Sequence, residues 1–417
     1  MSPTSRRLLC WALVLLPIVF MVWGVFRYSP DAMRDEDWDL VPLVEKSFEN
    51  TLTLKDLAGW NNEHRPLFPR ILEIAVIRWS DGNYKWGLAL NVLLSVGIFG
   101  MLVQRTERMS PWLLPPISIL VFSWRQWACW TFQGELNTLL GKFCILGGLL
   151  QLAEPEFGWL AFLLAMACGT VAVYSTANGF LFWLLGLVVL AARPASRRVF
   201  LPIWIAATAL LSWAYFGPGV PQEHLEGPRF ALQHPGEAVL FFFTFLGSTT
   251  GIDGSGALIM GIAGTVLFLT LSPGRIRDRQ NLPFVLFGTF ALLNAALVAA
   301  GRTRFGWRYA AESRYNTMTF PFWICALILL SQIRLGPRMA RAGAVLTFLA
   351  TCAALRASLA ARADSAQFFE DFKGAREAVR SGKDTAELRT LYPESGFEVV
   401  QNGIEILRKR RLYVFSP

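Results

Sequence analysis

The sequence predicts an all-α polytopic membrane protein with about eleven transmembrane helices. Of its 417 residues, 54% are hydrophobic and only 17% are charged, and the mean hydropathy is +0.41. Because soluble chains average about 25% charged residues, this composition is typical of a chain embedded in a membrane. Apolar stretches of roughly bilayer-spanning length recur along the chain. They predict spans at 8–26, 86–103, 112–124, 139–153, 158–173, 178–192, 199–216, 254–271, 282–300, 316–332 and 340–356.

The basic residues of the short loops predict how these spans are oriented. With eleven spans most of the loop arginines fall on one side, which is therefore expected to be cytoplasmic and to hold the N-terminus. The apolar segment 239–246 must then not cross, so we expect a re-entrant or interfacial helix there. Residues 1–356 form the predicted transmembrane domain, and residues 357–417 form a small polar tail on the exterior side. The arginines that set this orientation are Arg6, Arg7, Arg105, Arg108, Arg193, Arg197, Arg198, Arg275, Arg277, Arg279, Arg334, Arg338 and Arg341.

Charge and cysteine usage argue against several classes of protein. The formal net charge of +9 accompanies no basic soluble domain, so nucleic acid is not an expected partner. All six cysteines lie within or at the edge of apolar spans, which indicates neither a disulfide framework nor a zinc site. The sequence has no glycine-rich nucleotide-binding loop.

The first exterior loop, residues 27–85, is too long for a simple connection. It opens with the acidic run Asp35-Glu36-Asp37-Trp38-Asp39, and two amphipathic helices are predicted to follow on the membrane surface, the second from Leu67 to about Trp79. A carboxylate near an apolar surface has its pKa raised toward neutrality and can act as a general base. The four acids are therefore catalytic candidates. A solvated cap at the start of a surface helix gives the same pattern.

Further polar residues are expected to line a pocket beside this loop. Glu63, His64 and Arg65 occupy the turn before the second helix. Glu135 and Asn137 lie just before the next span, and Asn178 lies in a tight exterior turn. A capping and salt-bridge cluster is the alternative interpretation of the first three residues, and a plain loop explains the turn equally well.

The exterior loop 301–315 is rich in arginine, although short exterior loops are usually poor in basic residues. The planar guanidinium binds phosphate oxygens in bidentate fashion and stays charged in a partly dry setting. A specific phosphate site is therefore expected here. The alternative is a set of arginines bound to anionic headgroups or to loop carboxylates. The candidate phosphate-binding residues are Arg302, Arg304, Arg308, Arg314 and Tyr315.

The acidic run, the Asn62-Glu63-His64-Arg65 segment and the pairs Gly301-Arg302 and Arg314-Tyr315 carry a family resemblance. Together with the long first exterior loop and the many spans, they resemble the GT-C superfamily of membrane glycosyltransferases. The likeness is to bacterial enzymes that use polyprenyl-phosphate sugars and modify O-antigens. The resemblance implies a multi-pass protein of the bacterial inner membrane, with its N-terminus in the cytoplasm and its C-terminus in the periplasm.

The resemblance also implies roles for the candidate residues. Asp37 or Asp39 would be the catalytic base, with Asp35 and Glu36 as rivals. Arg314, aided by Arg302 or Arg304, would hold the carrier phosphate, and Glu63, His64 and Arg65 would orient the sugar or the acceptor. The expected partners are a polyprenyl-phosphate sugar donor, a glycan or lipid acceptor and membrane lipids. No cofactor is implied, and a divalent metal stays an open alternative.

Two other functions are compatible with exterior arginines. A flippase or transporter of a lipid-linked glycan would also bind phosphate, but alternating access places polar groups near the bilayer midplane, often in repeated halves. An O-antigen ligase or polymerase would use a lipid-diphosphate donor. Such proteins usually carry their large loop late in the chain, whereas here the largest loop between spans comes first.

Overall fold

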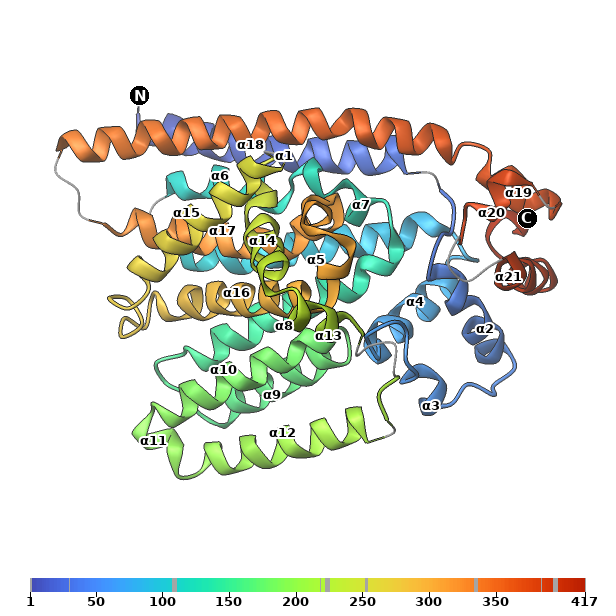
Figure 1. Cartoon of the computed structure of the whole chain (residues 1–417), viewed down its shortest axis with the longest axis horizontal. Helices are drawn as coiled ribbons and strands as arrows, with labels where there is room; N and C mark the ends of the chain where they lie inside the picture. The colour runs from blue at the N-terminus through green and yellow to red at the C-terminus, as the bar shows by residue number, and fades with distance from the viewer. Residues whose placement is uncertain are drawn as a thin grey trace.

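In a computed structural model the chain forms a bundle of helices capped at one end by shorter helices (Figure 1). The structure describes residues 2–29, 31–106, 111–217, 219–221, 226–251, 254–333, 337–383, 385–392 and 397–416. Within these ranges the fold is all-α, with no strand and one isolated bridge between Asn61 and His64. The predicted fold class is thus confirmed at the level of an all-α fold.

The predicted spans all contain helix, and the first exterior loop contains both predicted surface helices, as α2 and α4. The bundle helices are α1 (Pro3–Tyr28), α5 (Tyr84–Thr106), α6 (Leu114–Val121), α8 (Leu136–Leu152), α9 (Trp159–Val173), α10 (Phe180–Ala191), α12 (Phe200–Phe216), α14 (Pro235–Gly247), α15 (Ser255–Leu271), α16 (Leu282–Arg302), α17 (Asn316–Ser331) and α18 (Pro337–Asp371). The shorter helices are α2 (Asp37–Phe48), α3 (Leu54–Leu57), α4 (Leu67–Trp79), α7 (Trp127–Trp130), α11 (Pro194–Arg197), α13 (Glu226–Gln233), α19 (Ala375–Ser381), α20 (Ala386–Arg389) and α21 (Phe397–Arg410).

Only some of these helices are long and apolar enough to cross a membrane. In the described part of the chain three qualify, namely α1, α5 and α16, and a fourth is reached if α14 and α15 count as one bent span. The expected number of about eleven spans is therefore not confirmed. Length is the reason: α9 and α17 have 15 and 16 residues. At 1.5 Å per residue such helices reach about 24 Å, which is shorter than the bilayer core of about 30 Å.

Loops that were expected on the cytoplasmic side gather at one end of the bundle. Arg105, at the end of α5, forms an ion pair with Glu154. Arg193 donates to the carbonyl oxygen of Glu154 at 3.0 Å, and Arg279 donates to that of Pro155 at 3.2 Å. Arg108 and Arg334 of the same basic set lie outside the described residues, as do the side chains of Arg338 and Arg341.

Loops that were expected on the exterior side gather at the other end. Arg65 of the first loop donates to the carbonyl oxygen of Tyr215, at the end of α12, at 2.6 Å. The backbone N–H of Trp124 donates to the hydroxyl of Ser358 in α18 at 2.6 Å. The two sets of loops lie at opposite ends of α5, whose 23 residues span about 34 Å. This segregation agrees with the loop parity of the sequence interpretation.

The apolar segment 239–246 lies in α14, which meets α15 at an angle of 93°. Gly247 and Gly261 allow the two backbones to touch, because a Cβ atom on Gly247 would overlap the carbonyl oxygen of Ala257. Beyond α14, Thr249 hydrogen-bonds Thr319, which lies in the first turn of α17. The helix therefore ends near the exterior end of the bundle, as a re-entrant segment would.

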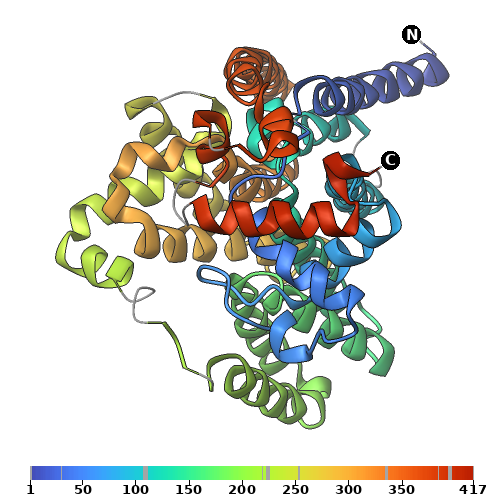
Figure 2. The ribbon, with the colours of Figure 1, turned by 90° about the vertical axis from the view of Figure 1, so that its right-hand side faces the viewer.

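The C-terminal tail packs back on the first exterior loop. The expected boundary at 356 falls inside α18, a 35-residue helix that runs beside α1 (Figure 1). After it, α21 lies across α2 (Figure 2). Lys409 pairs with Glu45 at 2.6 Å and Arg410 pairs with Glu49 at 2.5 Å. Gly403 of α21 faces the ring of Trp38, so helix α2 is held from outside by the tail.

We expect Gly403→Leu to loosen this contact. A Cβ atom at position 403 would lie 2.8 Å from a Trp38 ring carbon, so a larger side chain must push the helices apart. Overpacking of this kind costs about 1–3 kcal/mol. The variant should show faster proteolytic cleavage of residues 375–416 and a lower unfolding temperature in detergent. Gly100→Leu is the control, because a Cβ at Gly100 meets nothing within 4 Å. Equal stability of the two variants would contradict the predicted contact.

Candidate functional site

A cavity of about 170 Å³ opens where the exterior loops meet. Its wall combines the start of α2, the turn at 61–64, the inner face of α4, the start of α8, the end of α16 and the start of α17. Both carboxyl and guanidinium groups line this wall. The lining residues are Glu36, Asp37, Leu40, Asn61, Asn62, Glu63, His64, Pro66, Arg70, Glu73, Phe132, Gly134, Glu135, Asn137, Thr138, Arg302, Arg314, Tyr315 and Met318.

The cavity brings together many, but not all, of the residues singled out from the sequence. Those that line it are Glu36, Asp37, Glu63, His64, Glu135, Asn137, Arg302, Arg314 and Tyr315. Those that do not are Asp35, Asp39, Arg65, Asn178, Arg304 and Arg308. Segments up to about 280 residues apart in the chain thus contribute to one site.

Asp37 is the most buried member of the acidic run, with 5% of its surface exposed. It lies in the first turn of α2, and its Oδ2 accepts hydrogen bonds from the Tyr84 hydroxyl at 2.9 Å and the Arg34 backbone N–H at 3.3 Å. The Tyr84 oxygen in turn accepts from the backbone N–H of Gln133 at 3.0 Å. Burial raises the pKa of Asp37 to about 7, against the opposing effect of these hydrogen bonds. A carboxyl with this pKa can take a proton near neutral pH.

The other three acids are placed differently. Asp39 accepts a hydrogen bond from the hydroxyl of Tyr392 in the tail at 2.7 Å, and burial raises its pKa as well. Glu36 accepts from the Asn62 side chain at 2.7 Å. Asp35 has a positive φ of 48°, which directs the chain into α2. Only Asp37 and Glu36 therefore face the cavity, and only Asp37 is deeply buried.

The turn before α4 is a tight hairpin. Asn61 and His64 exchange backbone hydrogen bonds of 2.8 and 2.9 Å, and Asn62 adopts the left-handed conformation that closes the turn. The His64 Nδ1 accepts from the backbone N–H of Ala177 at 3.2 Å, so the ring proton is on Nε2. Glu63 pairs with Arg302 at 2.9 Å. The hairpin thus connects the first loop to both the 174–179 turn and α16.

Two arginines present their charge to the cavity. Arg302 is paired with Glu63, whereas Arg314 is exposed at the cavity mouth. The Arg314 guanidinium lies 5.2 Å from the ring centre of Tyr309 and 5.4 Å from that of Tyr315, and it donates to the Tyr309 hydroxyl. Contact with two rings holds the planar group in a defined orientation. Such a group can bind an anion at the mouth.

The predicted site residues outside the cavity mostly support the fold. Arg65 is buried and donates to the carbonyl oxygens of Ala58, Ala214 and Tyr215. The Asn178 amide donates to the Asn294 side chain at 2.5 Å, joining the exterior turn to α16. In the 301–315 loop, Arg304 pairs with Glu226 at 3.0 Å and Arg308 lies over the ring of Trp307.

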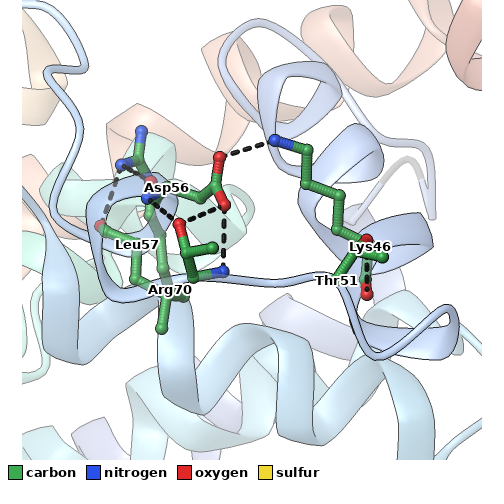
Figure 3. Close-up of polar contacts among 6 residues, drawn as sticks. Lys46, Thr51, Asp56, Leu57 and Arg70 are labelled. Atoms are coloured by element: carbon green, nitrogen blue, oxygen red, sulfur yellow. Dashed lines mark hydrogen bonds and ion pairs between the residues drawn. The ribbon is translucent and has the colours of Figure 1, made fainter.

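Sequence reasoning missed Glu73 and Arg70, on the inner face of α4. Glu73 is 7% exposed, and burial first, then the charge of Asp37, raise its pKa to about 8. The Arg70 guanidinium donates to the carbonyls of the α3 turn, including that of Leu57 at 3.0 Å (Figure 3). This turn is itself fixed by the pair between Lys46 and Asp56 at 2.5 Å (Figure 3). The signal in the sequence was the pair of opposite charges at Arg70 and Glu73, which lie three residues apart on the face of α4 opposite its apolar residues.

Lys142 was also not among the predicted site residues, whereas Asn137 was expected to line a polar cavity together with Glu135 and does so. Lys142 is buried in α8, two turns from Glu135, and its charge opposes the rise in the Glu135 pKa that burial causes. A lysine within an apolar span is a signal of function in itself. The buried Asn137 Oδ1 and Glu135 Oε2 have no hydrogen-bond partner in the described part of the chain. These oxygens are available to a bound molecule with hydroxyl groups.

Among the described residues, no three His, Cys, Asp or Glu side chains lie close enough together to hold a metal ion.

Comparison with models of protein families, with curated proteins and with solved structures finds no match to this chain.

The raised pKa of Asp37 predicts a stabilising effect of Asp37→Asn at neutral pH. Between about pH 4 and pH 7 the Asp37 carboxyl is ionised in the unfolded chain but keeps its proton in the folded protein. The free energy of unfolding of the wild type therefore falls as the pH rises through this range. A shift of about three units corresponds to about 4 kcal/mol at most. The variant should unfold at a higher temperature than the wild type at pH 7 and at a similar temperature at pH 4, followed by tryptophan fluorescence in detergent.

The exposed Asp364→Asn is the control, and its unfolding temperature should follow the wild type at both pH values. If Asp37→Asn is no more stable than wild type at pH 7, Asp37 is not held against ionisation in the folded protein.

Proposed function

We propose that this protein is a multi-pass membrane glycosyltransferase that moves a sugar from a polyprenyl-phosphate donor to a glycan or lipid acceptor. One observation carries the proposal. A single cavity at the exterior end of a bundle of apolar helices is lined by the buried carboxyl of Asp37 and by the guanidinium groups of Arg302 and Arg314. Transfer from a lipid phosphate needs a base for the acceptor and a cation for the leaving group. The resemblance to GT-C enzymes points in the same direction.

Asp37 is the proposed general base. Its carboxylate takes the proton of an acceptor hydroxyl while that oxygen attacks the anomeric carbon of the sugar. The hydrogen bond from Tyr84 and that from the Arg34 backbone fix the carboxyl, so the attacking oxygen meets a base in a defined position. The bond between the anomeric carbon and the phosphate oxygen breaks, and its electron pair leaves on the phosphate.

Arg314 and Arg302 are the proposed phosphate-binding residues. Negative charge grows on the polyprenyl phosphate as it departs, and guanidinium groups placed beforehand stabilise this charge more in the transition state than in the ground state. Arg314 lies at the mouth, where a lipid headgroup reaches the cavity from the bilayer. Arg302 binds Glu63 without substrate, so an incoming phosphate exchanges one anionic partner for another. Glu63 and His64 are then positioned to bind sugar hydroxyls.

The lipid tail of the donor would lie in the bilayer beside the apolar helices. This arrangement fits a protein of the bacterial inner membrane whose cavity faces the periplasm. A flippase would move the same lipid without breaking the sugar–phosphate bond, so release of free polyprenyl phosphate distinguishes the two functions.

Asp37→Asn should abolish sugar transfer by purified protein from synthetic polyprenyl-phosphate sugars. Loss of a general base typically lowers kcat about 10²–10⁴-fold. Asp39→Asn is the matched control on the same helix, and because Asp39 bonds Tyr392 outside the cavity, its kcat should fall less than about tenfold. Wild-type kcat/KM should rise with pH through about 7, where Asp37 ionises. Unchanged transfer by Asp37→Asn would remove Asp37 as the base.

Arg314→Gln should lower kcat/KM for the donor. A charged hydrogen bond is worth about 1.5–3 kcal/mol, which corresponds to a loss of roughly 10- to 150-fold. Arg304→Gln is the matched control, since Arg304 belongs to the same loop but pairs with Glu226 outside the cavity. Donor kinetics measured with radiolabelled lipid should separate the two variants. Equal losses in both would indicate a general electrostatic effect of the loop and not phosphate binding by Arg314.

A further inference from the structure

Glu73 is a second buried carboxyl in the wall of the same cavity. It comes from α4, whereas Asp37 comes from α2, and the two side chains are close enough for the charge of Asp37 to raise the pKa of Glu73. Their exposed fractions are 7% for Glu73 and 5% for Asp37. The cavity therefore contains two carboxyls that water barely reaches.

The two carboxyls differ in what binds them. Asp37 accepts hydrogen bonds from Tyr84 and from the Arg34 backbone. The Glu73 carboxyl makes no hydrogen bond and no ion pair with any residue that the structure describes. Glu73 thus offers both its oxygens to whatever occupies the cavity.

The nearest cation on the same helix does not neutralise Glu73. The Arg70 Nη1 donates to the carbonyl oxygens of Asp56, Leu57 and Gly59 at 3.3, 3.0 and 2.8 Å. Figure 3 shows the guanidinium directed toward Leu57. Its guanidinium is therefore directed to the α3 turn, although its charge still acts on Glu73 from a distance. A buried carboxyl without a paired cation is more stable when protonated.

When protonated, Glu73 can donate a hydrogen bond, which the carboxylate of Asp37 cannot do. A neutral carboxyl group carries an O–H donor beside a carbonyl acceptor, whereas a carboxylate only accepts. The raised pKa, about 8, agrees with a neutral Glu73 at neutral pH. An acid kept neutral in an apolar site is a known way to place a strong hydrogen-bond donor beside a reacting oxygen.

We propose that Glu73 is a second catalytic residue, whose protonated carboxyl donates a hydrogen bond to a sugar or acceptor oxygen of the substrate bound beside Asp37. This inference rests on the proposed function. Before transfer the two carboxyls together hold one proton, on Glu73. The acceptor O–H bond breaks and its proton moves to Asp37, while the acceptor oxygen forms a new bond to the anomeric carbon of the sugar. The bond between that carbon and the phosphate oxygen breaks, and its electron pair stays on the phosphate. Two protons are then present, and that of Asp37 returns to water as the product leaves.

Other charged and titratable groups surround Glu73. They share its helix, face it from α2 or α5, or lie on the remaining wall of the cavity. They are Arg70, Glu36, Asp37, Asp39, Tyr84, Glu63, His64, Glu135, Arg302 and Arg314. Of these, Asp37 and Arg70 act most strongly on Glu73, one against its ionisation and one in favour of it.

The test is the pH dependence of kcat/KM for purified wild type, Glu73→Gln and Glu73→Leu. The wild-type rate should rise through pH 7 as Asp37 ionises and fall above pH 8 as Glu73 loses its donor proton. Gln keeps an N–H donor and cannot ionise in this range, so the falling limb should vanish while the rising limb stays. Leu removes the donor at every pH and should lower kcat about 10²–10³-fold. The exposed Glu377→Gln should keep both limbs.

Two outcomes would overturn the inference. A falling limb that persists in Glu73→Gln shows that another group causes it, and wild-type kcat in Glu73→Leu shows that no donor is needed at this position. Either result, with Asp37→Asn inactive, leaves the proposed function standing and removes only the role of Glu73. A wild-type protein that transfers no sugar from any polyprenyl-phosphate donor overturns the proposed function and the role of Glu73 together.

Discussion

The packing of α2 between the tail and the bundle is the constraint on which the site depends. On its inner side, the hydroxyl of Tyr84 is buried with Asp37. On its outer side α21 and the Tyr392 hydroxyl fix the helix. Held on both sides, α2 places a carboxyl where water barely reaches, and this exclusion of water, more than any single contact, makes that carboxyl basic.

Two carboxyls of the cavity differ from one of its guanidinium groups in depth. Asp37 and Glu73 are buried, whereas Arg314 is exposed at the mouth. An anion arriving from the bilayer surface therefore meets a cation first, and a neutral sugar can extend toward the acids behind it. Burying an uncompensated phosphate beside carboxylates would be costly, so this separation of charge favours a substrate with one anionic end and one neutral end.

Several residues of the cavity could be predicted from the sequence, because they lie in short segments that are unusually rich in acidic residues or in arginine. The limits of α4, Leu67 to Trp79, are those that its periodicity predicts. The sequence does not reveal which acid is buried, because tertiary contacts with Tyr84 and the tail decide it. It also hides Glu73: the apolar pattern of α4 includes Ile71 and Trp79, which are 43% and 68% exposed, while the opposite face packs inward. The expected number of spans is not confirmed, since several apolar helices are shorter than a bilayer core is thick.

The contact between α21 and α2 also determines when the packing around α2 is completed during synthesis of the chain. Lys409 and Glu45 are separated by 364 residues of chain. Translation proceeds at about 5–20 residues per second, so α2 leaves the ribosome roughly 20–70 seconds before its outer partner exists. During this interval the acidic helix is held from one side only. The wall of the cavity is thus completed late in synthesis, when the segment that contains α21 folds over α2.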